Sequence, residues 1–93
     1  MNIDKIKDGV SKVAKRHNIK KVELFGSYAE GKNTRKSDVD LLVDFDDPSM
    51  SLFKLFEVQR EFEKQLRKKV DVIATPISKD SFVIINKVVP IYG

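Results

Sequence analysis

The segment that most restricts the fold is Asp38–Phe45, whose sequence is DVDLLVDF. Its apolar and β-branched residues, followed by the turn signal Asp46-Asp47-Pro48, predict a strand. Because side chains alternate along a strand, Asp38 and Asp40 leave the same face, with their Cα atoms roughly 6.5–7 Å apart. Two neighbouring carboxylates repel each other unless a cation lies between them. Their oxygens suit a hard divalent ion such as Mg²⁺, which keeps open positions for phosphate and water. The segment therefore predicts a site for a metal and a nucleotide.

A third carboxylate, Asp71, interrupts the apolar segment Val70–Ala74 (VDVIA), which predicts another strand. Taken alone, Asp71 is typical of a solvated residue on a half-exposed strand. If this strand lies beside Asp38–Phe45, however, Asp71 joins Asp38 and Asp40. Three carboxylates can hold two metal ions roughly 3.5–4 Å apart, an arrangement used for in-line phosphoryl and nucleotidyl transfer.

The dipeptide Gly26-Ser27 follows another predicted strand, Lys21–Phe25, and precedes a short polar excursion. Glycine lets the backbone approach a ligand closely, and a turn into a helix presents free N–H groups to phosphate. We therefore expect Gly26 and Ser27 to bind nucleotide phosphates. Ser37, directly before the aspartate pair, is a further candidate for nucleotide binding, although a local turn or backbone hydrogen bond is the plainer interpretation.

The composition excludes several other kinds of site. The chain has 93 residues, no Cys and one His, which rules out disulfides, thiolate metal sites, a Cys nucleophile and a two-His site within one chain. We expect residues 1–93 to form a single domain without a membrane span or signal peptide, which favours the cytoplasm. The net charge of +4 averages over basic segments and the concentrated aspartates.

The remaining pattern predicts an α+β domain: a small mixed sheet with helices mainly on one face. A first helix is expected from an Asn2 cap to about Arg16, with His17 as a surface residue at its end. One helical turn is expected over Ser27–Gly31. A long helix capped by Ser49 or Ser51 should bury one broad apolar stripe, made by Leu52, Leu55, Phe56, Phe62 and Leu66. The tail Ser78–Val89 suits either a strand or a helix.

The string GSYAEGKNTRKSDVDLLVDF resembles the signature of the nucleotidyltransferase superfamily that includes DNA polymerase β. In that signature Gly-Ser is followed, after a spacer, by Asp-x-Asp and apolar residues. The chain is most similar to the minimal branch, the MNT domains. The resemblance covers nearly the whole chain, including VDVIA and the terminal Ile91-Tyr92-Gly93.

The resemblance implies a nucleotidyltransferase fold and roles for individual residues. Asp38 and Asp40 would be the principal Mg²⁺ ligands, and Asp71 would be a third ligand and a base for the acceptor's proton. Members of this branch are encoded with HEPN-domain proteins, often as the antitoxin to a toxin, and some transfer AMP from ATP to a tyrosine of that partner. Glu30 departs from the pattern, since many relatives have a basic residue there; Lys32, Arg35 or Lys36 could replace its phosphate contact.

Three alternatives stay open at this point. An antitoxin could neutralise its partner by binding alone, with a weak or unused nucleotide site. A small-molecule nucleotidyltransferase, for instance of the aminoglycoside-modifying kind, would need an added domain or a dimer. A nucleic-acid binder would use the basic residues between Lys5 and Lys21, which are more typical of a solvated helix face.

Overall fold

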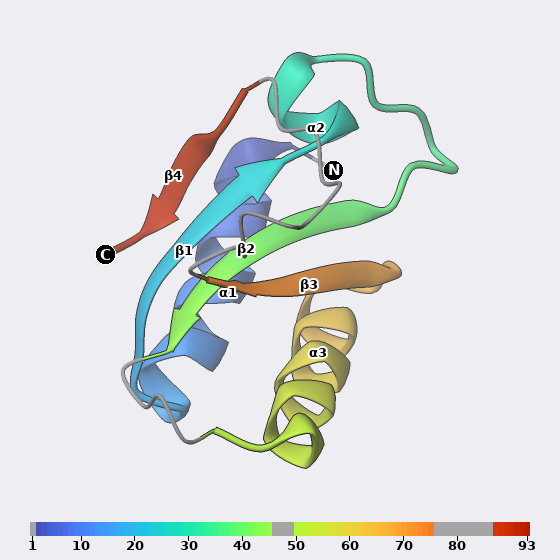
Figure 1. Cartoon of the computed structure of the whole chain (residues 1–93). Helices are drawn as coiled ribbons and strands as arrows, with labels where there is room; N and C mark the ends of the chain where they lie inside the picture. The colour runs from blue at the N-terminus through green and yellow to red at the C-terminus, as the bar shows by residue number, and fades with distance from the viewer. Residues whose placement is uncertain (1, 46–49, 76–86) are drawn as a thin grey trace, which may run out of the picture.

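Four strands and three helices make up the computed structural model, which describes residues 2–45, 50–75 and 87–93. The elements run α1 (Ile3–Arg16), β1 (Ile19–Phe25), α2 (Ser27–Glu30), β2 (Val39–Phe45), α3 (Leu52–Leu66), β3 (Val70–Thr75) and β4 (Val89–Tyr92). The sheet order is β3-β2-β1-β4. Strand β1 is antiparallel to β2 and β4, whereas β2 and β3 are parallel. Helices α1 and α3 cover one face of the sheet (Figure 1), which confirms the predicted α+β class.

The helix starts follow from their caps. The side chain of Asn2 accepts a hydrogen bond from the N–H of Lys5 at 2.9 Å, and Ser51 does the same for the N–H of Lys54 at 3.2 Å. Each bond satisfies a donor that the first turn of a helix leaves free. Of the two serines expected to cap the long helix, Ser51 is therefore the one that does so.

The core lies between the sheet and the two long helices. Along β2, Val39, Leu41 and Val43 are fully buried, and of the residues on the opposite face Leu42 is buried while Asp40 and Asp44 are half-buried. Because side chains alternate in a strand, the aspartates lie on the face away from α1 and α3. The helices fill the core with side chains spaced by three or four residues: Ile6, Val10, Val13, Val58, Phe62 and Leu66.

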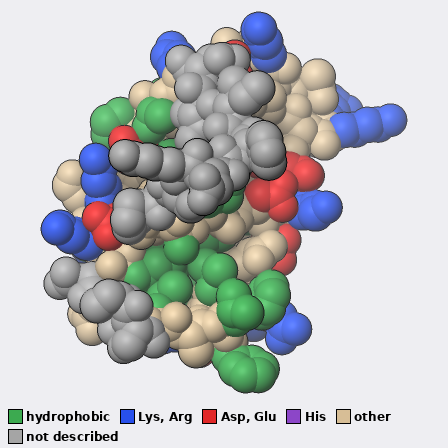
Figure 2. All heavy atoms as spheres, in the orientation of Figure 1, with side chains coloured by type: hydrophobic (Ala, Val, Ile, Leu, Met, Phe, Trp, Pro, Cys, Tyr) green, Lys and Arg blue, Asp and Glu red, His purple; other side chains and the backbone are tan. Residues whose placement is uncertain are grey.

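The apolar stripe expected along α3 is partly wrong. Leu52 and Phe56 are 69% and 56% exposed, and the neighbouring Phe53 is 87% exposed. At 3.6 residues per turn, Phe56 lies about 120° around the helix from the buried Phe62. Figure 2 shows hydrophobic side chains on the surface that includes α3. Val58, which the expected stripe omits, takes the core position one turn before Phe62.

The exposure of Phe56 predicts a small stability effect. We expect Phe56→Ser to change the free energy of unfolding by no more than about 0.5 kcal/mol, since surface substitutions seldom do more. The control Val58→Ala, at a fully buried position in the same helix, should cost about 2 kcal/mol. Urea unfolding of both variants measures the difference, and equal losses would contradict this account of α3.

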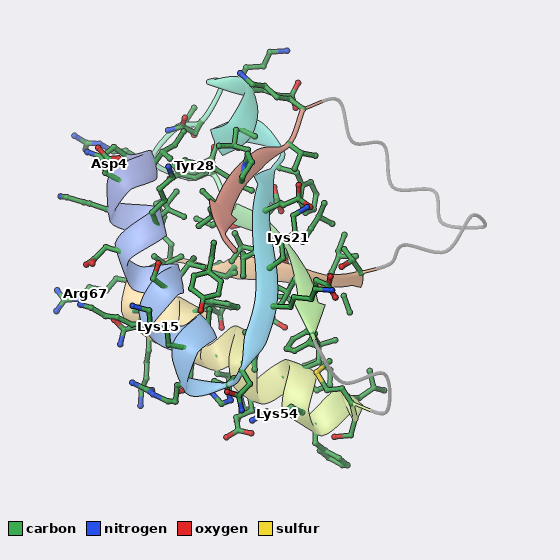
Figure 3. All side chains as sticks on the ribbon, turned by 90° about the vertical axis from the view of Figure 1, so that its left-hand side faces the viewer. Asp4, Lys15, Lys21, Tyr28, Lys54 and Arg67 are labelled. Atoms are coloured by element: carbon green, nitrogen blue, oxygen red, sulfur yellow. The ribbon has the colours of Figure 1, made fainter. Side chains whose placement is uncertain are left out.

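His17 is not the surface residue that the sequence predicts, since its side chain is only 6% exposed. Lys54 donates a hydrogen bond to His17 Nδ1 at 2.6 Å, and His17 Nε2 bonds to Glu61. Burial alone would raise the pKa of Glu61, but hydrogen bonds from His17 and Arg16 hold it below its ordinary value. These contacts join the end of α1 to α3, where Lys54 lies (Figure 3). The chain bends at Asn18, whose φ is +54°.

The C-terminal strand β4 is absent from the sequence-based expectation, because Pro90 weakens a strand pattern. Its place at the edge of the sheet explains why a proline is tolerated there. Residues 78–86, which are most of the ambiguous tail, lie outside the described residues. Within the described ranges, no helix has the length and apolar character that crossing a bilayer requires.

Candidate active site

The sheet register places Asp71 beside Asp40. In the parallel pair β2–β3, Asp40 is the partner of Asp71, and in the antiparallel pair β1–β2 it is the partner of Phe25. The end of β1 and the beginnings of β2 and β3 therefore lie side by side at one end of the strands, which is called this edge of the sheet below (Figure 1). Partners in a ladder share a face, so both carboxylates lie on the face that α1 and α3 leave uncovered.

Asp40 is the aspartate at this edge whose pKa is shifted by its neighbours. Burial, followed by the charges of Asp71 and Asp38, raises the pKa of Asp40 from 3.8 to about 6, and a side-chain hydrogen bond with Asp71 adds to the rise. An acidic group with this pKa retains a proton well into the weakly acidic range. A cation bound here would offset the repulsion from Asp71 and Asp38, which is one of the causes of the shift.

Asp38 precedes the first residue of β2 and is not a ladder partner of Asp71. Its carboxylate is 39% exposed, and its Oδ2 is 4.0 Å from Lys69 Nζ. In the part of the chain that the structure describes, no three His, Asp or Glu side chains converge as a complete metal site. The structure thus brings together Asp40 and Asp71, while Asp38 faces a lysine of the segment that leads into β3.

The three aspartates fit a hard divalent cation by their chemistry. All the donors are carboxylate oxygens, which Mg²⁺ prefers, and two of them already share one side of the sheet edge. Burial and the neighbouring negative charges both disfavour the ionised form of Asp40, and a bound cation would favour it. Asp38 directly precedes β2 and is two residues from Asp40, so it lies near the same end of the strands as the pair.

The turn after β1 touches the central carboxylate. Gly26 has φ +75° and ψ −154°, a conformation that only glycine adopts readily. A Cβ at Gly26 would lie 2.1 Å from Asp40 Oδ2 and 3.0 Å from its Cγ. The turn is closed by the Glu30 N–H, which donates to the carbonyl of Gly26 at 3.1 Å. Gly26 therefore borders the Asp40 carboxylate, as a phosphate-binding turn would have to, and the half-buried Ser27 directly follows it.

The hydroxyl of Ser37 has a local role. It accepts a hydrogen bond from the Thr34 N–H at 2.8 Å, and the Ser37 N–H donates to the Thr34 carbonyl at 3.1 Å. This is the local interpretation that the sequence allows, and a nucleotide contact by Ser37 stays a prediction. Glu30 is 4.0 Å from Lys32 Nζ, so it pairs with one of the basic residues expected to compensate for it.

Sequence reasoning missed Lys68, to which it gives no role in the site. Lys68 Nζ donates to the carbonyl of Arg35 at 2.9 Å and to that of Ser37 at 3.2 Å. The sequence could have indicated Lys68 through its position three residues before Asp71, which puts it close to the start of β3.

The raised pKa of Asp40 predicts a pH-dependent effect on stability. Because the folded protein holds this proton more tightly than the unfolded chain, wild-type stability falls as pH rises from about 4 to about 6. We expect Asp40→Asn, measured by urea unfolding with EDTA, to stabilise the fold at pH 7.5 by about 1 kcal/mol, a figure reduced for solvent screening. This difference in stability between variant and wild type should vanish near pH 4, where Asp40 of the folded wild type is protonated and therefore as neutral as the asparagine.

Asp44→Asn is the matched control. Asp44 lies on the same strand and face but has Lys21 and Thr75 as its strand partners instead of an acidic residue. We expect no comparable gain from this change. A less stable Asp40→Asn variant at pH 7.5 would contradict the proposed repulsion.

Comparison with known proteins connects this edge of the sheet to a family. Residues 3–89 match the family described as the nucleotidyltransferase domain. A candidate protein adenylyltransferase of Methanocaldococcus jannaschii, MJ0435, is 36% identical over 95 residues, covering 98% of this chain and 99% of its own.

Two solved structures share the fold. One is a toxin–antitoxin with AMP-PNP, at 20% identity and a TM-score of 0.75 over 94% of this chain and 73% of the other. The second is the tri-AMPylated HEPN toxin of Shewanella oneidensis in complex with MNT antitoxin, at 18% identity and a TM-score of 0.70 over 98% of this chain and 72% of the other. By its family match and its full-length likeness to MJ0435, the chain belongs to the nucleotidyltransferase domain family.

Proposed function

We propose that this protein transfers AMP from ATP to a tyrosine hydroxyl of a HEPN-domain toxin and so acts as its antitoxin. The observation that carries the proposal is the carboxylate pair Asp40–Asp71, set against the Gly26 turn at one edge of the sheet. Full-length similarity to a candidate protein adenylyltransferase supports the reaction class. The two solved toxin–antitoxin relatives support the kind of partner.

The proposal gives each group a part in the reaction. Asp38, Asp40 and Asp71 would hold Mg²⁺, two ions in the full arrangement, which supplies charge stabilisation at the transferring phosphoryl group. Gly26 and Ser27 would bind the triphosphate through backbone N–H groups and the serine hydroxyl. As the acceptor oxygen bonds to the α-phosphorus, the bond to the bridging oxygen breaks and pyrophosphate leaves. The acceptor's proton passes to a carboxylate, for which Asp71 is the candidate.

The acceptor surface is proposed to belong to the partner. The helices α1 and α3 are used for the core, and the described part of the chain has no further layer beyond the Asp40 face that could hold a specific acceptor. We therefore propose that residues 1–93 act as one catalytic domain in the cytoplasm, where ATP and the partner would meet.

The experiment combines the protein with labelled ATP, Mg²⁺ and the HEPN-domain protein encoded beside it. We expect label on the partner, at a tyrosine identified by mass spectrometry, and loss of the toxin's activity. Neutralisation that needs neither ATP nor the aspartates would overturn catalysis in favour of binding alone. Label transferred only to a small hydroxylated molecule would overturn the choice of partner.

A further inference from the structure

Lys68 connects two segments that carry different parts of the proposed site. It follows α3 and lies at the entrance to β3, the strand that carries Asp71. Its ammonium group donates to the carbonyls of Arg35 and Ser37, both in the loop that ends at β2. The Ser37 carbonyl belongs to the peptide bond that leads directly into Asp38. One side chain thus ties the backbone next to Asp38 to the start of the strand that carries Asp71.

The next residue reinforces this connection through its backbone. The carbonyl of Lys69 accepts a hydrogen bond from the Val39 N–H at 3.0 Å. Asp38 therefore lies between two anchored peptides, one held by the Lys68 side chain and the other by the β2–β3 ladder. Ladder bonds hold β2 and β3 whatever the side chains are, so the Lys68 ammonium is the contact that depends on residue type.

Besides the bonds from Lys68, the loop is held by its own hydrogen bonds between Thr34 and Ser37. Residues 31–36 are exposed, and a cavity of about 300 Å³ is lined by Tyr28, Asn33, Thr34, Arg35 and Lys68. Lys68 Nζ also lies 5.8 Å from the centre of the ring of Tyr28, which is only 5% exposed. The buried ring and the two carbonyls fix the ammonium from three sides. Hydrogen bonds from a charged donor are stronger than those between neutral groups.

We propose that Lys68 is a positioning residue, which sets the place of Asp38 relative to the Asp40–Asp71 pair and thereby tunes metal affinity. The inference rests on the proposed function, because it concerns the metal that this function requires. Lys68 itself is assigned no contact with metal or nucleotide. Residues that orient metal ligands typically change metal affinity by about 10–100-fold when they are replaced.

The test compares Lys68→Met, which keeps an apolar stem without the charge, with Lys68→Arg, which keeps a cationic donor. Mn²⁺ is the probe, titrated alone and followed by electron paramagnetic resonance. We expect Lys68→Met to weaken Mn²⁺ binding by at least about 10-fold and Lys68→Arg to stay within about 3-fold of wild type. Lys7→Met, an exposed lysine on α1, is the matched control and should bind Mn²⁺ like wild type.

Two further measurements separate positioning from other roles. Hydrogen exchange should show faster exchange of the Thr34 and Ser37 amides in Lys68→Met, with α1 unchanged. The Mg²⁺ concentration needed for half-maximal AMP transfer should rise in step with the Mn²⁺ dissociation constant. If Mn²⁺ binding is unchanged and only ATP affinity falls, Lys68 contacts phosphate directly and the inference is overturned.

Different results would overturn the proposed function and the role of Lys68. Wild-type protein that binds Mn²⁺ but transfers no AMP would overturn the function, while the variants would still decide the role of Lys68. Normal Mn²⁺ binding by Lys68→Met in an active protein would overturn the inference alone. Lys68→Gln serves as a second neutral variant. Failure of both neutral variants to fold would overturn positioning, because Lys68 would then be required for stability.

Discussion

Replacing Asp40 by Asn should reduce AMP transfer to the partner by on the order of 10³-fold or more, while the protein stays folded. Asp40 is the carboxylate that interacts with Asp71, Asp38 and Gly26. It is the ladder partner of Asp71, its pKa responds to Asp71 and Asp38, and its Oδ2 faces Gly26. An amide keeps the shape of the side chain but removes the charge that would hold the cation. Transfer of label from ATP, followed with time, measures the loss.

Asp44→Asn is again the control, and it should retain transfer within about 2-fold, as expected of a change outside the site. The same strand and the same face make the comparison specific for the position of the charge. Transfer that persists in the double variant Asp38→Asn/Asp40→Asn would rule out the assigned mechanism. Because Asp40→Asn is expected to be more stable than wild type at neutral pH, its inactivity could not be attributed to unfolding.

Gly26→Ala is expected to lower ATP affinity and transfer by at least about 10-fold and to destabilise the fold. Two causes act together at this position. The backbone conformation, with φ +75° and ψ −154°, is strained for any residue with a Cβ. The new Cβ would also lie 2.1 Å from Asp40 Oδ2, so the carboxylate would have to move. ATP binding by calorimetry and thermal unfolding together measure the effect.

Gly31→Ala separates the two causes in part. Gly31 also has a positive φ, +71°, but a Cβ there would meet nothing within 4 Å. We expect this control to lose only about 1 kcal/mol of stability and little ATP affinity. The clash itself is tested by combining Gly26→Ala with Asp40→Ala, which leaves only the Asp40 Cβ, at 3.3 Å. Strictly additive effects on stability in this cycle would show that the clash with the carboxylate is unimportant.

Much of the fold can be predicted from local signals in the sequence. Asn2 and Ser51 are strong caps, and the helices begin directly after them. Apolar residues and aspartates locate β2, since Val39, Leu41 and Val43 suit the face that packs on the helices, and Asp40 and Asp44 suit the opposite face. These features depend on neighbours along the chain, so one sequence is enough to find them.

The features that could not be predicted depend on long-range packing. Nothing local distinguishes Phe56 from Phe62, and only the docking of α3 decides which ring is buried. His17 is buried because α3 supplies Glu61 and Lys54 around it. The side-chain bonds of Lys68 to the loop carbonyls likewise exist only once the chain has folded. For the site, the sequence suggests that Asp71 could join the aspartate pair, but the strand order that places it beside Asp40 is visible only in the structure.

The parallel pairing of β2 with β3 has a consequence for how activity is lost. Parallel neighbours need a crossover, and here α3 is the crossover between the two strands. The hairpin β1–β2 can bring Gly26 to Asp40 by itself, but Asp71 arrives only after α3 has docked on the sheet. A partly folded intermediate that has only the hairpin therefore holds an incomplete ligand set. Catalytic competence and cooperative tertiary structure should accordingly appear and disappear together, with no fragment retaining residual transfer.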